Sequence, residues 1–322
     1  MKKKHVALVL RLLISVGLIG YFLFALSRKY GGLGPALQQF TAAFSGASLA
    51  WLLPASLLHL VGFSLMSIRW RILLKAQSVE ASFGQLFAYY FMAAFFNTFL
   101  PSTIGGDTVR ALESKKLTGN TTTSVMVVIV ERLTGFMALA LIATCALIIK
   151  ISRSHMTDPT VWIFVVIMLG AFVLLIGGAH PKIAPVFLRL LGKILPAKIH
   201  ALLVRAHDAV CIFYNKPAAL FSALGVSIVF QLVMVFYYFM LASALNCHPD
   251  LVEFGMMVPI MIVLLMTVPA INGMGIRTAG FQGLMKFPAA YALALECLDL
   301  VLRLFYGLLG GVFFLLYKRN QQ

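Results

Sequence analysis

Long uninterrupted apolar stretches occupy most of this chain, and polar positions gather in the short segments between them. About 20 consecutive apolar residues are enough for one helix to cross the hydrocarbon core of a bilayer. Six stretches reach or approach that length: 6–26, 51–68, 124–149, 161–178, 218–245 and 289–317. The pattern therefore predicts an all-α polytopic membrane protein, with a single membrane domain over residues 1–322.

Two further apolar stretches, 83–100 and 254–271, end in loops rich in proline and glycine. The first loop reads FLPSTIGGDTVRA and the second TVPAINGMGIRTA, so each has a proline, two glycines and an arginine in the same order. Two similar elements that enter from opposite faces are typical of an inverted repeat. The alternative is a coincidental likeness between two glycine- and proline-rich loops.

The distribution of lysine and arginine predicts the topology, because short cytoplasmic loops carry an excess of both. Segment 182–217 has six basic residues, whereas 246–253 has none and carries two acids. If 83–100 crossed the membrane fully, 182–217 would lie outside, against this rule. We therefore predict about six full spans and two oppositely directed re-entrant hairpins. Both termini and 182–217 are then cytoplasmic, 246–253 is outside, and the repeat halves are 1–160 and 161–322.

Two segments need a separate interpretation. Segment 182–217 is rich in leucine, isoleucine and valine but is broken by basic residues and by the prolines at 185 and 196. This composition favours one or two amphipathic helices on the cytoplasmic surface, with a solvated linker as the alternative. The N-terminal stretch 6–26 is longer than a typical signal-peptide core and lacks a clear small-residue cleavage site, so we expect a retained first helix.

The composition agrees with a membrane protein: of 322 residues 61% are hydrophobic and 11% charged, against roughly 25% charged in soluble domains. The net charge of +16 would suggest nucleic acid as the partner of a soluble protein. Here the basic residues lie at the ends of apolar stretches, so the excess of lysine and arginine in cytoplasmic loops explains most of them. Attraction to anionic lipids is a further role. We expect membrane lipids as partners and no nucleic acid.

The first loop is a candidate binding site, since irregular backbone at membrane depth survives only inside protein or along a polar cavity. Gly105 and Gly106 permit close backbone approach. Asp107 is suited to cap a helix beginning near Thr108, whose free N–H groups would face an anion. Arg110 adds a guanidinium fork suited to phosphate. The alternative is a cytoplasmic turn in which Asp107 and Arg110 pair with each other.

The second loop offers the same kinds of group, with Gly273 and Gly275 followed by Arg277. If the two loops enter from opposite faces, a negatively charged headgroup can pass from one to the other without crossing bare hydrocarbon. In this hypothesis Arg110 and Arg277 bind the phosphate at successive stages.

Five charged residues lie deep within the apolar stretches 124–149 and 289–317. Each charge at the bilayer centre costs about 2.5–3.5 kcal/mol, so such residues face the protein interior and have partners. Asp299 and Arg303, four residues apart, are expected to pair. One interpretation is a structural ion-pair network. The other is a polar path, in which two arginines contact the headgroup and three carboxylates carry protons or ions; the residues are Arg132, Arg303, Glu131, Asp299 and Glu296.

Two smaller patterns concern packing. The sequence Arg69-Trp70-Arg71 at the end of a long apolar stretch is typical of an interfacial anchor. Gly307 and Gly311 form a Gly-xxx-Gly pair, which we interpret as internal helix packing rather than dimerisation.

Motifs for other chemistries do not occur in the sequence. It has no glycine-rich nucleotide-binding loop, no histidine–cysteine metal cluster and no nucleophile–base arrangement, and its four cysteines are scattered. We therefore expect no cofactor, no metal, no enzymatic activity and no ATP-driven pumping by this chain alone.

Four sequences together resemble the flippase-like membrane family: NTFLPSTIGGDTVRA, VIVERLTG, SIRWRILL and VPAINGMGIRTAG. This family is the transmembrane region of lysylphosphatidylglycerol synthases and also occurs as stand-alone proteins. The resemblance implies a role in flipping aminoacylated phosphatidylglycerol, or in polyprenyl-linked glycan or hopanoid pathways. Family members often have an acid after the second glycine run, where this chain has Arg277-Thr278. It also lacks the aminoacyl-transferase domain, so we do not expect it to make lysyl-lipid.

These observations favour translocation, or flipping, of an anionic phospholipid or a polyprenyl-phosphate-linked lipid across a bacterial-type cytoplasmic (inner) membrane. The alternative is a lipid-binding scaffold or accessory subunit of a membrane enzyme that assembles lipids or glycans. Beyond the anionic lipid substrate, candidate partners are a second copy of the chain or enzymes of lipid biosynthesis.

Overall fold

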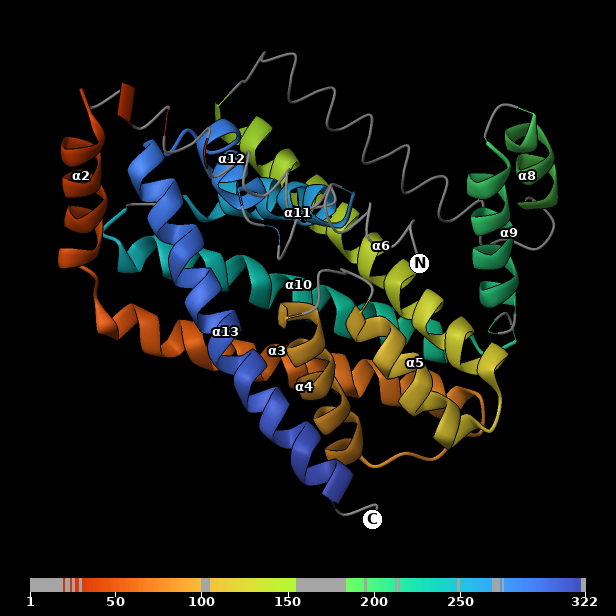
Figure 1. The fold of residues 1–322 in the computed structure, drawn as a ribbon. Coiled ribbons are helices and arrows are strands. Elements are labelled where there is room, and N and C mark those ends of the chain that lie inside the picture. The colour runs from red at the N-terminus through yellow and green to blue at the C-terminus, as the bar shows by residue number, and fades with distance from the viewer. Residues whose placement is uncertain are drawn as a thin grey trace. The chain divides into compact units, whose positions relative to one another are not determined.

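A computed structural model describes residues 31–99, 105–154, 184–193, 196–211, 215–247, 250–267 and 275–319, with a few single residues besides. Its described residues form helices and no strand (Figure 1). The predicted spans 6–26 and 161–178 lie almost entirely outside them. The helices are α2 (Leu33–Ser45), α3 (Leu49–Ala76), α4 (Phe83–Phe99), α5 (Gly105–Thr118), α6 (Thr121–Ser154), α8 (Ala184–Gly192), α9 (Ala197–Cys211), α10 (Pro217–Ala244), α11 (Leu251–Thr267), α12 (Ile276–Gly283) and α13 (Ala289–Arg319).

Four of the helices are long and apolar enough to cross a membrane: α3, α6, α10 and α13. They contain the predicted spans 51–68, 124–149 and 218–245, except the last residue of the third, and all of 289–317. Helix α11 is apolar but shorter. The protein is therefore all-helical and polytopic, as the apolar pattern predicts.

The chain folds into two compact units that both draw on distant parts of the sequence. Unit 1 comprises residues 1–62, 88–109 and 233–322, and unit 2 comprises 63–87 and 110–232. Helices α3 and α10 each contribute residues to both units.

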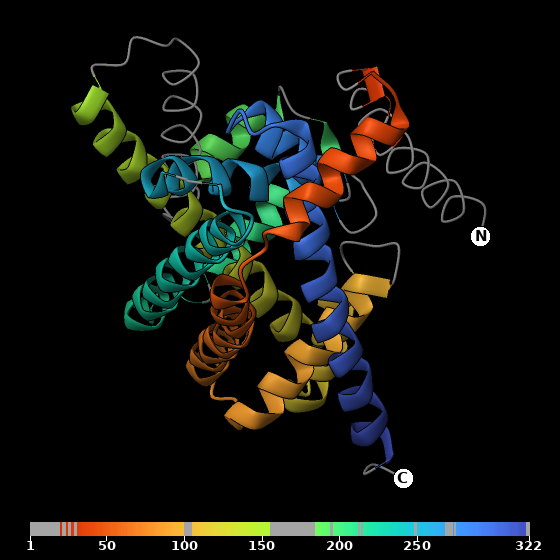
Figure 2. The same cartoon turned by 90° about the vertical axis from the view of Figure 1, so that its left-hand side faces the viewer.

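Unit 1 is organised around α13, which contacts α2 and α12 (Figure 2). Glycines on α13 also allow close approach of α4. A Cβ at Gly307 would lie 3.0 Å from Thr98 Oγ1, and one at Gly311 would lie 2.9 Å from the Phe95 ring. The prediction that Gly307 and Gly311 serve internal packing is thus confirmed.

Unit 2 is organised around α6, which contacts α9, and α9 in turn contacts α8. Helices α8 and α9 occupy the segment 182–217, for which the sequence predicts one or two helices. Val186 and Leu190 on α8 are exposed, although both are large and apolar.

Within each unit α3 and α10 run antiparallel. In unit 1 the Ser48 N–H donates to the Ala244 carbonyl (2.9 Å), and the His59 and Tyr237 rings lie 4.7 Å apart. In unit 2 Arg69 Nη1 donates to Ser227 Oγ (2.9 Å). Lys216 Nζ in the same unit donates to the Ala76 carbonyl. In both units, later residues of α3 therefore meet earlier residues of α10.

The helix boundaries recur with one spacing. Helices α3 and α10 begin at 49 and 217, α4 and α11 at 83 and 251, and α6 and α13 at 121 and 289, so each pair is 168 residues apart. The ends of α3 and α10, at 76 and 244, keep this spacing, as do those of α4 and α11, at 99 and 267. We call this the 168-residue register.

Candidate functional site

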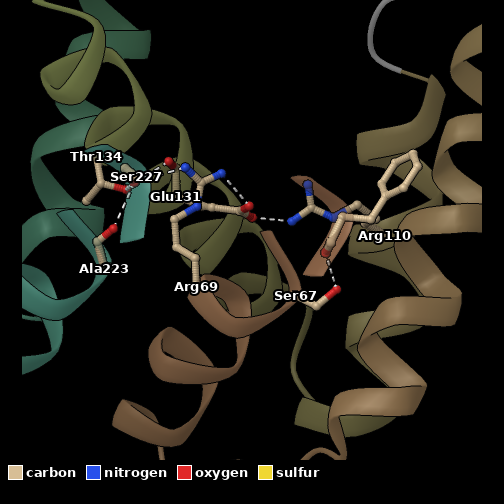
Figure 3. A network of polar contacts seen from close by, with 8 residues as sticks. Ser67, Arg69, Arg110, Glu131, Thr134, Ala223 and Ser227 are labelled. Atoms are coloured by element: carbon tan, nitrogen blue, oxygen red, sulfur yellow. Dashed lines mark hydrogen bonds and ion pairs between the residues drawn. The ribbon is translucent and has the colours of Figure 1, made fainter. Parts of the chain in front are cut away.

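Glu131 is the centre of a buried ionic cluster in unit 2 (Figure 3). Its side chain is only 2% exposed, and its two carboxylate oxygens accept from two different arginines. Arg69 Nη2 lies 2.7 Å from Oε1, and Arg110 Nη2 donates to Oε2. The α6 carboxylate thus joins a guanidinium from α3 to one from α5.

Neighbouring residues hold both guanidinium groups in place. The Arg110 guanidinium carbon lies 4.6 Å from the centre of the Trp70 ring, a cation–π geometry. Ser227 Oγ accepts from Arg69, as described above. Gly135 lies beside Arg69, because a Cβ there would be in ordinary contact with Nη1, at 3.5 Å. We call Arg69, Trp70, Arg110, Glu131 and Ser227 the Glu131 cluster.

Helix α5, which carries Arg110, begins earlier than the sequence predicts. It starts at Gly105 rather than near Thr108, and Asn97 Oδ1 accepts from the Gly106 N–H (2.8 Å). The prediction that Asp107 caps this helix from outside is therefore wrong: Asp107 lies within the first turn. Gly106 must be glycine, because a Cβ would lie 2.6 Å from the Ala93 carbonyl oxygen. The Asp107 side chain lies outside the described part of the chain.

Asp299 is the centre of a comparable cluster in unit 1, and it is 1% exposed. Arg277 Nε and Arg303 Nε lie 2.9 and 2.8 Å from its Oδ2. The Tyr237 hydroxyl donates to Oδ1 (2.9 Å), and the Tyr238 hydroxyl accepts from Arg277 Nε (3.2 Å). The predicted Asp299–Arg303 pair is confirmed. We call Tyr237, Tyr238, Arg277, Asp299 and Arg303 the Asp299 cluster.

Glu296 fills the N-terminal end of α12. Its carboxylate accepts from the Gly275 N–H (2.7 Å) and from both the N–H (3.0 Å) and the hydroxyl of Thr278. Gly275 has a positive φ of 80°, which suits glycine. Gly273 is also confined, because a Cβ there would lie 2.5 Å from Arg277 Nη1. The N–H groups at this helix end therefore bind a carboxylate of the chain itself, from α13.

The structure brings most of the sequence-predicted charged residues into these clusters. Arg110 joins Glu131, while Arg277, Asp299 and Arg303 meet in unit 1 beside Glu296. Arg132 is only partly buried on α6. Gly105 begins α5.

The interpretation of Arg69-Trp70-Arg71 as an interfacial anchor is wrong for its first two members. Arg69 is 6% exposed and Trp70 is fully buried, whereas Arg71 is exposed. Helix α3 continues to Ala76, so this three-residue sequence lies inside a helix rather than at its end.

Sequence reasoning also missed Tyr237, Tyr238 and Ser227 as cluster residues. A signal for the two tyrosines was present, because they stand 168 residues after Arg69 and Trp70. That signal becomes readable only once the register of the helices is known.

No group of metal-ligating side chains occurs among the described residues. The four cysteines are free thiols. Burial raises the pKa of Cys211, and the negative charge of Asp208 raises it further. Burial likewise raises the pKa of Cys247.

The long apolar helices and the ionic groups buried among them define an integral membrane protein. A family model, the lysylphosphatidylglycerol synthase TM region, matches residues 8–311. The chain therefore belongs to this family, whose description points to a function related to membrane lipids. No curated protein and no solved structure matches the chain.

Proposed function

We propose that this protein translocates an anionic phospholipid or a polyprenyl-phosphate-linked lipid across the cytoplasmic membrane. One observation carries the proposal: each of the two short helices, α5 and α12, delivers an arginine to a buried carboxylate on a long helix. A guanidinium that binds a carboxylate has the shape and charge to bind a lipid phosphate instead.

The carboxylates give this exchange a trigger. Removing one partner of a buried ion pair costs about 3–5 kcal/mol, so an arginine leaves its carboxylate only if another anion replaces it. Protonation of Glu131 or Asp299 would weaken its hold on the arginine, and the lipid phosphate would take its place. In this scheme Arg110 and Arg277 bind phosphate at successive stages, and the carboxylates couple transport to protons.

The proposed topology has about six spans and two oppositely directed re-entrant hairpins, α4–α5 and α11–α12. Two observations support an inverted repeat with halves 1–160 and 161–322. Helices α3, α4 and α6 begin 168 residues before α10, α11 and α13. Moreover, α3 and α10, which correspond in the 168-residue register, run antiparallel in each unit. Corresponding helices of opposite direction are what an inverted repeat requires.

Reconstitution into liposomes tests the function. Vesicles would carry fluorescent phosphatidylglycerol, fluorescent polyprenyl phosphate or, as a zwitterionic control, fluorescent phosphatidylcholine. We expect movement of one anionic lipid, its loss in Arg110→Ala and Arg277→Ala, and partial activity in the lysine variants, which keep the charge but not the planar fork. Wild-type rates in both alanine variants, normalised to folded protein, would exclude the phosphate exchange.

A second candidate function is a lipid-binding scaffold or accessory subunit of a membrane enzyme. The observation that favours it is that Glu131, Glu296 and Asp299 all have partners within the chain, as a structural network would. This candidate predicts that labelled anionic lipid binds the purified protein but is not moved between leaflets in the same vesicles.

A further inference from the structure

The contacts between α3 and α10 in the two units are reciprocal. Arg69 contacts Ser227 in unit 2, and His59 contacts Tyr237 in unit 1. Arg69 and Tyr237 correspond in the 168-residue register, and so do His59 and Ser227. Each contact is therefore the counterpart of the other, with the roles of the two helices exchanged.

A second pair of contacts obeys the same relation. Lys216 contacts Ala76 in unit 2, and Ser48 contacts Ala244 in unit 1. Lys216 corresponds to Ser48, and Ala244 corresponds to Ala76. Two independent pairs of contacts therefore follow the 168-residue register. The register thus relates individual residues as well as helix boundaries.

The two ionic clusters correspond under this relation. Asp299 corresponds to Glu131, and each is the carboxylate at the centre of its cluster. Tyr238 corresponds to Trp70, and each is the aromatic residue that contacts the arginine of the short helix. Those arginines, Arg110 and Arg277, depart from the register by one residue.

The second guanidinium of each cluster comes from a different helix. In unit 2 Arg69 of α3 supplies it, and Gly135 of α6 lies beside it. In unit 1 the position of Arg69 is held by Tyr237, and the position of Gly135 is held by Arg303. The loss of an arginine on one helix is matched by the gain of one on the other, so both carboxylates keep two guanidinium partners.

We propose that the Glu131 and Asp299 clusters are two copies of the same latch, one in each repeat. Arg69 and Arg303 are positioning residues that have the same role from different helices. Each latch holds the short helix of its repeat to the long helix, α5 to α6 and α12 to α13. In transporters with inverted repeats, the two halves exchange conformations as access alternates. This inference rests on the proposed transport function. Breaking one latch favours one access state of the transport cycle, and breaking the other latch favours the opposite access state.

Moving the second arginine of the Glu131 cluster from α3 to α6 tests whether Arg69 and Arg303 are equivalent. Arg69→Tyr removes one guanidinium, Gly135→Arg adds a third to the Glu131 cluster, and the double variant gives unit 2 the arrangement of unit 1. We expect each single variant to lower the melting temperature and the double variant to recover most of the loss. Arg71→Tyr, at an exposed neighbour, is the matched control and should have no effect.

A second readout separates a latch from a merely structural contact. Ala111 and Ala279 correspond in the register and lie on the two short helices. As single cysteines in a background without native cysteines, they report side-specific labelling by an impermeant maleimide. We expect Arg69→Tyr to change the labelling rate at 111 by about tenfold and Arg303→Gly to do so at 279, from opposite sides of the membrane, within the range typical of coupled sites.

The outcomes separate the latch from the transport function. A double variant no better than the worse single one, or labelling changes on the same side of the membrane in both variants, would overturn the latch. If recovery and opposite labelling occur but the wild-type protein moves no labelled lipid, the latch stands and the proposed transport fails.

Discussion

The Glu131 and Asp299 clusters both place two guanidinium groups beside one carboxylate, but they use different residues to do so. In both, a carboxylate on a long helix accepts from two arginines, and an aromatic side chain contacts one of them. They differ at the start of the short helix. A neutral amide, Asn97, accepts from Gly106 of α5, whereas the carboxylate of Glu296 accepts from the backbone of α12. Helix α12 is therefore tied to α13 by an ionic cap as well as by an ion pair.

This difference teaches which parts of the arrangement the molecule can vary. The acid on the long helix, the arginine on the short helix and an aromatic neighbour occur twice. The source of the second guanidinium and the cap of the short helix differ. Changes to the shared parts should therefore have large and similar effects on the two clusters, and changes to the other parts should affect the two clusters differently.

The largest expected effect is loss of a central carboxylate. Glu131→Gln and Asp299→Asn remove the charge that offsets two buried arginines, a change of about 3–5 kcal/mol for a buried pair. If the carboxylates also carry protons, transport in proteoliposomes should fall further than the yield of folded protein. Equal losses of transport and yield would assign both residues to structure alone.

The two caps should differ in strength. Glu296→Gln weakens charged hydrogen bonds worth about 1.5–3 kcal/mol each. Asn97→Ala removes a neutral cap worth about 1 kcal/mol. We expect a clearly larger fall in melting temperature for Glu296→Gln, measured by thermal unfolding in detergent. A larger fall for Asn97→Ala would contradict the ionic cap.

The aromatic partners should differ less. Trp70→Leu removes the ring beside Arg110, a contact worth about 2 kcal/mol when shielded from water. Tyr238→Phe keeps the ring and removes only the hydroxyl that accepts from the charged Arg277 guanidinium, a hydrogen bond worth about 1.5–3 kcal/mol. We therefore expect falls in melting temperature of similar size for the two variants. An unchanged melting temperature in Trp70→Leu would argue against the cation–π contact.

The smallest effect concerns two native thiols, one in each unit. Burial raises the pKa of Cys211 and of Cys247, so at pH 8 each has less reactive thiolate than a free cysteine. Maleimide labelling should be slow and should accelerate as the pH rises beyond the ordinary thiol value. The proposed topology places Cys211 inside and Cys247 outside, so an impermeant reagent added to intact cells should reach only Cys247. External labelling of Cys211 would refute the double re-entrant topology.

The long helices could be predicted from the sequence because burial in lipid demands long apolar stretches. The charged residues within α6 and α13 could be singled out for the same reason, since lipid does not tolerate them alone. The Asp299–Arg303 pair followed from helical spacing. These inferences succeeded because they depend on local pattern and on the solvent.

Other features depended on partners far away in the chain. Arg69 resembles an interfacial anchor until α3 is seen to continue beyond it and Glu131, 62 residues later, is seen beside it. Asn97, not Asp107, accepts from Gly106, because α5 begins three residues earlier than the local pattern predicts. No local pattern shows which distant residue will complete a cluster.

The antiparallel contacts of α3 and α10 also have a consequence for biosynthesis. The bond from Arg69 to Ser227 joins residues 158 positions apart, and Tyr306 must be made before its hydroxyl can reach Ser56, 250 positions earlier. At about 5–20 residues per second, the ribosome needs roughly 8–30 seconds to pass from Arg69 to Ser227. During that interval α3 resides in the membrane without α10, so the nascent chain depends on the insertion machinery or lipid headgroups to shelter a guanidinium destined for burial.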